Sequence, residues 1–132
     1  MGVRYICRID DPASLDRIPT FLRDEVLGAL LAPLGDDVVR ERALTETTYR
    51  HPDGNKLLAR WGTLEANVVY DMSFPPAPGA TFVLDLDVAT GAPQVFSPGV
   101  LTDLARLFAE RQYRFFRWAV TDDFLRAYGG QP

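Results

Sequence analysis

Two aspartates, Asp85 and Asp87, are the first residues in this sequence that could carry chemistry. They lie two positions apart in a segment of alternating apolar residues, and on a strand this spacing places both carboxylates on one face of the sheet. Paired carboxylates can share a proton in acid–base catalysis or bind a hard cation such as Mg²⁺. Without a third ligand or a histidine nearby, the pair also fits a charged sheet face on which acids meet arginines.

Arginines supply possible partners for these aspartates and a possible site for an anion. Lys56 is the only lysine among 14 basic residues. Arginine suits bidentate binding of carboxylates and phosphates, so an arginine patch would fit an acidic peptide, a phosphate or a nucleic-acid backbone. The nearby acids would instead neutralise such a patch, and Glu46, Arg50 and Asp71 can join that network. The candidate binding residues on this charged face are Arg4, Arg8, Arg40, Arg42, Arg60, Asp85 and Asp87.

Cys7 and His51 are the only cysteine and the only histidine. To act as nucleophile and base they would have to touch and be oriented by a third group. Cys7 alternates with apolar residues of a strand, which favours a small buried core residue. His51 begins a turn sequence, which favours an exposed position. The counts exclude an intrachain disulfide and a zinc site of the usual cysteine and histidine type, so no metal site is predicted.

Composition and charge narrow the possible ligands and location. The net charge of -4 disfavours a general nucleic-acid binder. Isolated glycines such as Gly62 and Gly91 form neither a phosphate loop nor a dinucleotide fingerprint, so no cofactor is predicted. From Met1 to Asp11 charged and apolar residues alternate, with no apolar run long enough for a signal peptide or a membrane span. These features, with the single cysteine, predict a cytoplasmic protein that contacts no membrane.

Alternating apolar residues predict four to five strands. The segment Thr81–Ala89 has the clearest pattern, in which the apolar residues face a core and Val83, Asp85 and Asp87 point away. A strong turn signal at 51–55 separates two neighbouring strands and indicates an antiparallel meander. The expected strands are Val3–Ile9, Asp37–Arg50, Lys56–Leu64, Asn67–Phe74 and Thr81–Ala89.

Helical spacing of apolar residues appears in two places. The first predicted helix runs from about Leu15 to Leu31, is best formed from Pro19 or Thr20, and ends at Pro33 and Gly35. The second is long and carboxy-terminal, from Ser97 to about Ala119.

The long helix is expected to begin after Ser97 as N-cap, with Pro98 at the first helical position, and to reach Ala119. Thr121 then starts a short terminal helix with acidic residues in its first turn. The 132 residues hold no repeat or linker, which predicts one domain over residues 1–132. The order of elements predicts an α+β fold, with an antiparallel meander sheet packed on one face by the long helix and the shorter helix after the first strand.

The long helix carries more aromatic residues than one sheet face can cover. Tyrosine, tryptophan and arginine are enriched at the centres of protein interfaces, which makes an interface one interpretation. An aromatic-rich core with an exposed arginine stripe is the other. The candidate interface residues are Arg111, Tyr113, Arg114, Phe116 and Arg117.

Several short motifs resemble one bacterial protein family. They are Gly2 to Asp10, Phe82 to Val88, Phe115-Phe116 and Val120-Thr121-Asp122. In these motifs the chain is similar to the carboxy-terminal half of a sporadically distributed, functionally uncharacterised family about twice as long. The resemblance implies no activity, substrate or cofactor. It implies that a further half normally precedes this one, and Cys7 stands where the family pattern has asparagine.

Two functions of different classes follow from these patterns. The first is a non-catalytic binding or accessory domain that acts through protein–protein association, as a homodimer or in a complex with another protein. The missing catalytic motif favours this over an enzyme, and the surplus apolar surface of the long helix favours a homodimer in which its arginines meet Glu110 or Asp103 of the second chain. The alternative is a small enzyme or ligand-binding domain that uses Arg4, Arg8, Asp85 and Asp87 on the charged face.

Overall fold

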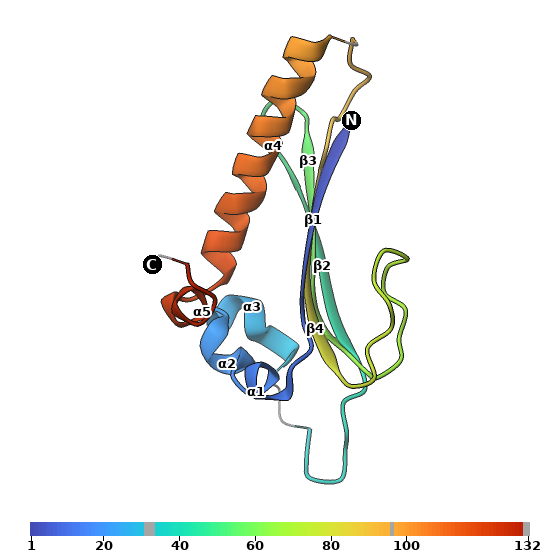
Figure 1. Cartoon of the computed structure of the whole chain (residues 1–132), viewed down its shortest axis with the longest axis vertical. Helices are drawn as coiled ribbons and strands as arrows, with labels where there is room; N and C mark the ends of the chain where they lie inside the picture. Colours follow the sequence, from blue (N-terminus) through green and yellow to red (C-terminus); the bar gives the residue numbers. More distant parts are fainter. Residues whose placement is uncertain (31–33, 96, 131–132) are drawn as a thin grey trace.

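The computed structural model describes residues 1–30, 34–95 and 97–130. Within these ranges four strands form one antiparallel sheet, and the helices lie on one side of it (Figure 1). The strands are β1 (Gly2–Ile9), β2 (Ala43–Arg50), β3 (Lys56–Leu64) and β4 (Thr81–Ala89). The helices are α1 (Pro12–Leu15), α2 (Ile18–Phe21), α3 (Asp24–Leu27), the short 3-10 helix η1 (Gly28–Leu30), α4 (Pro98–Ala119) and α5 (Asp122–Ala127). The predicted α+β fold with a long C-terminal helix is confirmed.

The strands β2, β3 and β4 form the predicted meander, and β1 pairs with the remaining side of β4. The resulting order is β1-β4-β3-β2, with every pair antiparallel. Directly opposed residues share a face of the sheet. Asp85 lies opposite Ile6 on one side and Arg60 on the other, while Asp87 lies opposite Arg4. The central position of β4 therefore surrounds Asp85 with side chains from both neighbouring strands.

The apolar face of β4 packs against α4. Its residues Phe82, Leu84, Leu86 and Val88 are at most 2% exposed, as the alternation predicts, and Phe108 of α4 is fully buried in the same core. Burial of one such side chain contributes roughly 1.5–3 kcal/mol to stability. The core is thus the layer between the sheet and the helices.

Helix α4 has the predicted boundaries and an additional polar attachment to the sheet. It begins at Pro98 and ends at Ala119, and α5 follows with Thr121 as its N-cap. Gln112, only 6% exposed, donates hydrogen bonds from Nε2 to the carbonyls of Val3 (2.6 Å) and Leu86 (3.0 Å). These bonds fix the position of α4 against β1 and β4, since moving the helix would leave a buried amide without partners.

The single helix predicted from Leu15 to Leu31 is wrong. The segment forms α1, α2, α3 and η1 instead, while Leu31 and Pro33 lie outside the described residues. The chain becomes extended at Leu22. Its amide still donates to the carbonyl of Ile18 in the preceding turn (3.2 Å), and its backbone forms a bridge to Val120 at the end of α4. The Arg23 amide donates to the carbonyl of Ala119 (3.0 Å), and the Thr121 amide donates to the carbonyl of Phe21 (2.8 Å). Tertiary hydrogen bonds therefore override the helical spacing.

Two predicted strands also differ from the structure. The strand expected over Asp37–Arg50 begins only at Ala43, so its first part is irregular. The strand expected over Asn67–Phe74 is absent from the described residues, because that segment is a series of turns. Asn67 has a left-handed backbone with φ of 62°, and the Asp71 carboxylate accepts a hydrogen bond from the Ser73 amide (2.9 Å). Such local side-chain bonds favour turns over a ladder.

Candidate functional site

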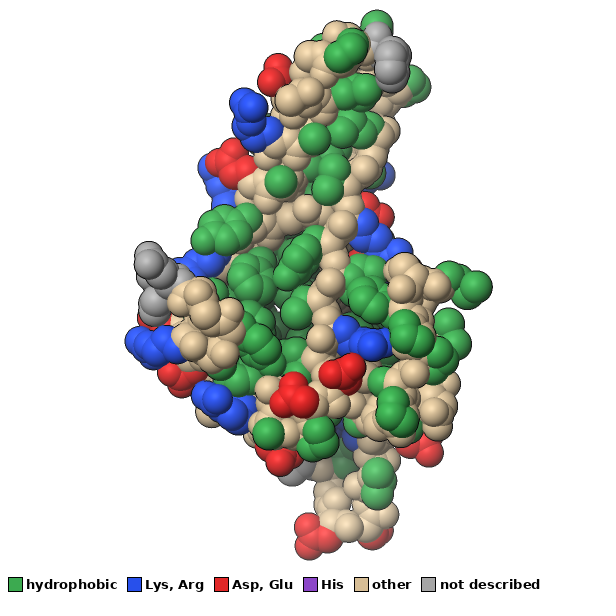
Figure 2. Space-filling model, viewed as in Figure 1, with side chains coloured by type: hydrophobic (Ala, Val, Ile, Leu, Met, Phe, Trp, Pro, Cys, Tyr) green, Lys and Arg blue, Asp and Glu red, His purple; other side chains and the backbone are tan. Residues whose placement is uncertain are grey.

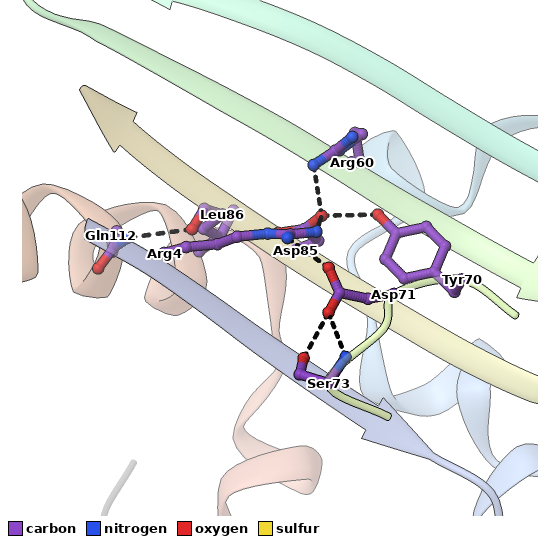
Figure 3. A network of polar contacts seen from close by, with 8 residues as sticks. All are labelled: Arg4, Arg60, Tyr70, Asp71, Ser73, Asp85, Leu86 and Gln112. Carbon is purple, nitrogen blue, oxygen red and sulfur yellow. Dashed lines mark hydrogen bonds and ion pairs between the residues drawn. The ribbon is translucent and has the colours of Figure 1, made fainter. Parts of the chain in front are cut away.

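Asp85 is the centre of a buried ion cluster on the sheet face opposite the helices (Figure 3). Its side chain is fully buried. Its Oδ1 accepts a hydrogen bond from Arg4 Nε (2.9 Å). Its Oδ2 is contacted by Arg4 Nη2 (2.8 Å), Arg60 Nη2 (2.7 Å) and the Tyr70 hydroxyl (2.7 Å). One carboxylate on the central strand thus joins β1, β3 and the segment between β3 and β4.

Arg4 connects this cluster to a second acid. Its Nη1 contacts Asp71 Oδ2 at 2.5 Å, so one guanidinium bridges Asp85 and Asp71. The other oxygen of Asp71 accepts hydrogen bonds from the amide and the hydroxyl of Ser73 (Figure 3). The tight turn at 71–73 is therefore part of the cluster, and its position depends on Arg4.

Hydrogen bonds and charge fix the protonation states in the cluster. Burial raises the pKa of Asp85, but the hydrogen bonds from Arg4 and Tyr70 and the charge of Arg60 outweigh it, so that the pKa lies below its ordinary value. Hydrogen bonds from Ser73, and then from Arg4, lower the pKa of Asp71 to about 2. Burial, followed by the hydrogen bond to Asp85, raises the pKa of Tyr70 to about 12. At neutral pH the two acids are ionised and the phenol is protonated.

This geometry does not favour the catalytic or metal-binding interpretation of Asp85 and Asp87. The carboxylate of Asp85 already has four donors, three at Oδ2 and one at Oδ1, so both of its oxygens are engaged within the chain. Asp87 lies on the same face but makes no hydrogen bond or ion pair with any described residue. No group of three or more histidine, cysteine or acidic residues in the described ranges could hold a metal ion.

The segment 65–80, called here the cover segment, lies over this sheet face (Figure 1). Arg8 donates to the carbonyl of Pro75 (2.7 Å), and its guanidinium lies 5.2 Å from the ring centre of Phe74. Arg42 pairs with Glu65 (2.7 Å) at the start of the segment. Three of the arginines predicted to bind an external anion, Arg4, Arg8 and Arg42, therefore bind the cover segment of the same chain.

The remaining residues of the predicted charged face are dispersed. Arg40 precedes β2 and donates to the carbonyl of Leu30, away from the Asp85 cluster. Arg60 belongs to the cluster, where its guanidinium also lies 6.0 Å from the ring centre of Tyr70. The structure thus brings Arg4, Arg60 and Asp85 together and places Arg40 elsewhere.

Cys7 and His51 are not brought together. Cys7 lies on the edge strand β1, packed partly against the core, and burial raises the pKa of its thiol. His51 lies in the turn after β2, the strand at the opposite edge of the sheet, where its amide donates to the carbonyl of Asn55 (2.9 Å). The predicted turn is present, but His51 is half-buried rather than exposed.

The candidate interface residues of α4 are divided between two sides of the helix. Phe116 packs against Tyr5 of β1, with ring centres 6.2 Å apart, and Tyr113 beside it is 61% exposed. Arg117 follows Tyr113 by one turn. On the other side, Arg111 pairs with Asp53 of the β2–β3 turn (2.6 Å).

Arg114 pairs with Glu110 along the surface of α4 (2.6 Å), and both side chains are more than half exposed. Together with the pairing of Arg111 to Asp53, this means that two arginines expected to meet acids of a second chain have partners in their own chain. The exposed aromatic side chains lie on the other side of α4, next to β1, away from these two ion pairs. The interface prediction is therefore best examined at the β1 side of α4.

An aromatic groove runs between β1 and the helices α4 and α5. It consists of two hollows of about 480 and 250 Å³ that share Tyr5, Tyr113 and Phe116. Figure 2 looks onto this face and shows hydrophobic side chains gathered between α4 and β1. We call this surface the edge groove, and it is lined mainly by Tyr5, Cys7, Tyr113, Phe116, Phe124 and Tyr128.

Sequence reasoning missed several residues that define these sites. Tyr70 falls within the strand predicted over Asn67–Phe74, although the acid and serine at 71 and 73 are a turn signal that favours a loop. The alternation over Val3–Ile9 predicts that Tyr5 shares the core face of the strand with Cys7, but Tyr5 is 44% exposed because β1 is at the sheet edge. No sequence signal indicates this edge position, since it depends on the pairing of β1 with β4.

Comparisons of this chain with protein-family models, curated proteins and solved structures gave no match. The family resemblance suggested by the motifs of β1 and β4 therefore stays a prediction. The helices in the described part of the chain include none that is long and apolar enough to cross a membrane.

The Asp85 cluster predicts a large difference between two neighbouring substitutions. Asp85→Asn leaves the partly buried guanidinium of Arg60 without a charged partner and weakens the hydrogen bonds at a fully buried position, so we expect it to lower the free energy of unfolding by about 2–3 kcal/mol. Asp87→Asn, on the same strand and face, removes an acid without a partner and should change stability by at most about 0.5 kcal/mol. Urea unfolding followed by circular dichroism measures both. Equal stability of the two variants would contradict the structural role of Asp85.

The lowered pKa of Asp71 predicts a specific loss of stability in acid. Because its pKa in the folded chain is about 2 and its ordinary value is 3.8, this carboxylate stabilises the fold above that ordinary value. The contribution is lost as the pH falls from about 4 towards 2. We expect the free energy of unfolding to fall more steeply across this window in the wild type than in Asp71→Asn. Parallel pH profiles for the two proteins would refute the assignment.

Proposed function

We propose that this chain is a non-catalytic binding domain that acts through protein–protein association, with β1 and the edge groove as its docking surface. One observation carries the proposal: three tyrosines around one unpaired strand edge are strongly exposed. Tyr5 is 44%, Tyr113 61% and Tyr128 49% exposed. Large aromatic side chains contribute most when buried, and tyrosine is enriched at interface centres.

The open edge of β1 supports association by strand pairing. β1 has eight residues and, within the described part of the chain, pairs on one side only, with β4. An unpaired edge offers a row of backbone donors and acceptors to another strand. The opposite edge, β2, is rich in threonine and carries Glu46 and Arg50. Exposed polar and charged edges of this kind resist pairing. β1 also carries two charged residues, Arg4 and Arg8, but both are held by the cover segment of the same chain, which makes β1 the better docking edge.

We take the partner to be a second copy of the chain. Antiparallel pairing of β1 with its own copy around a two-fold axis would give a continuous eight-stranded sheet, with both copies of α4 on the same face. Each copy would then supply a strand and an aromatic patch, so Tyr113 and Phe116 would meet the same side chains of the partner. This arrangement needs no charged pairs from Arg111 or Arg114, which already have partners in their own chain.

The free cysteine of this chain fits a protein that works in a reducing compartment. Cys7 is a free thiol that lines the edge groove, and a reducing cytoplasm would keep it from forming a disulfide with a second chain. A cytoplasmic location is part of this proposal.

Substitution of Tyr113 tests the proposed dimer. Tyr113→Glu would place a charge at the centre of the interface, so we expect the wild type to sediment as a dimer at micromolar concentration and the variant as a monomer. The side chain is largely exposed in one chain, so the monomer should keep its stability to within about 0.5 kcal/mol. Analytical ultracentrifugation and urea unfolding give the two quantities.

Tyr49→Glu is the matched control, because Tyr49 is 43% exposed but belongs to β2 at the other sheet edge. It should leave the dimer intact. A wild type that stays monomeric throughout, or a dimer that is lost with Tyr49→Glu and kept with Tyr113→Glu, would overturn the proposal. A second substitution, Phe116→Glu, is a less specific test of the interface, because Phe116 also packs on Phe124 within the chain.

A further inference from the structure

A second concave surface lies on the other side of α4, between this helix and the hairpin formed by β2 and β3. The hollow has a volume of about 770 Å³. Sites for small molecules have volumes of about 300–1,000 Å³ and combine an apolar lining with a few polar groups. We call this surface the hairpin cleft. It shares no lining residue with the edge groove.

The interior of the hairpin cleft is apolar and aromatic. Leu57 of β3 and Phe115 of α4 are 4% and 9% exposed, which makes them its base. Tyr49 and Trp118 are 43% and 39% exposed, and their ring centres lie 5.9 and 5.3 Å from that of Phe115. Three adjacent rings at these separations, two of them open to solvent, offer faces and edges against which a planar apolar group can pack.

Arginines supply the polar side of the cleft. Arg111 is held by Asp53, and only 13% of its side chain is exposed. Arg114 is 75% exposed and pairs with Glu110, which is itself 53% exposed. Exposed ion pairs contribute little, so Arg114 can exchange Glu110 for an anionic group of a ligand at small cost. A guanidinium binds carboxylate and phosphate groups with two parallel hydrogen bonds.

His51 adds an unsatisfied polar atom to the wall of the cleft. Its Nε2 is buried and has no hydrogen-bond partner among the described residues. Buried polar atoms usually have a partner, and an atom without one is most easily satisfied by a molecule that is not part of the chain.

We propose that the hairpin cleft binds a small amphipathic anion, with a planar apolar body and one carboxylate or phosphate group. The body would pack against Tyr49, Phe115 and Trp118, and the anionic group would bind Arg114. This inference does not depend on the proposed dimer, because the cleft and the edge groove lie on opposite sides of α4.

Two dyes that differ in a single charge test the proposal. Anilinonaphthalene sulfonate is an aromatic anion with a planar naphthalene ring system, and phenylnaphthylamine has the same rings without the sulfonate. We expect the sulfonate to bind more tightly, and Arg114→Gln to weaken its binding about fivefold while leaving the neutral dye unchanged. Trp118→Ala removes a packing surface and should weaken both dyes about threefold to tenfold.

Two control variants and one NMR reporter separate this site from other surfaces. Arg106→Gln removes an exposed arginine that lies on α4 but does not line the cleft, so it should leave both dyes unaffected. Tyr113→Glu alters the edge groove and should also leave dye binding intact. His51, as the only histidine, gives one assigned pair of ring signals in NMR, and these should shift when the sulfonate is added to the full chain.

The outcomes are decisive in either direction. No binding of the sulfonate, unmoved His51 signals, or an equal loss with Arg106→Gln and Arg114→Gln would overturn the proposal. Loss of binding with Tyr113→Glu would place the dye in the edge groove and would also refute it. If the cleft binds as expected, naphthoate and naphthyl phosphate then distinguish carboxylate from phosphate as the preferred anionic group.

Discussion

A buried carboxylate on the central strand is the constraint on which the rest of this structure depends. An ionised group without contact to water is very costly unless other charges and hydrogen bonds replace the water. Asp85 therefore needs Arg4 from β1, Arg60 from β3 and Tyr70 from the cover segment. These three requirements together account for the position of β1 beside β4 and for the path of the chain across the second face of the sheet.

The cover segment lies over the sheet face that carries Asp85, and this limits where a partner or a ligand can bind. Its arginines are engaged with Asp85 or with the cover segment, so the charge that suggests an anion site in the sequence is used inside the molecule. The surplus aromatic side chains of α4 then lie along its two flanks, one beside the open edge of β1 and the other beside the β2–β3 hairpin. Both proposals concern these flanks, and neither requires chemistry at Asp85.

Much of the fold is predictable from local patterns, whereas the sites depend on pairing that the sequence does not display. The alternation in β4 and the proline at the start of α4 predict their elements correctly, because each of these signals depends only on residues a few positions apart in the sequence. The helix expected over 15–31 fails because Leu22 pairs with Val120, nearly a hundred positions away. The sequence also predicts that Asp85 and Asp87 share a face of the sheet. It does not predict that only Asp85 is buried, because that burial depends on Tyr70 and the cover segment. The division of the α4 arginines between two flanks is visible only once the helix is placed on the sheet.

We propose that β1 is the open edge through which this domain associates. Hydrogen–deuterium exchange of the β1 amides at low and at high protein concentration tests it most directly, because strand pairing protects backbone amides from exchange. The account predicts that the amides of β1 become more protected as the concentration rises, while those of β2 at the other edge do not change. Protection that grows in β2, or that is independent of concentration in both strands, would contradict it.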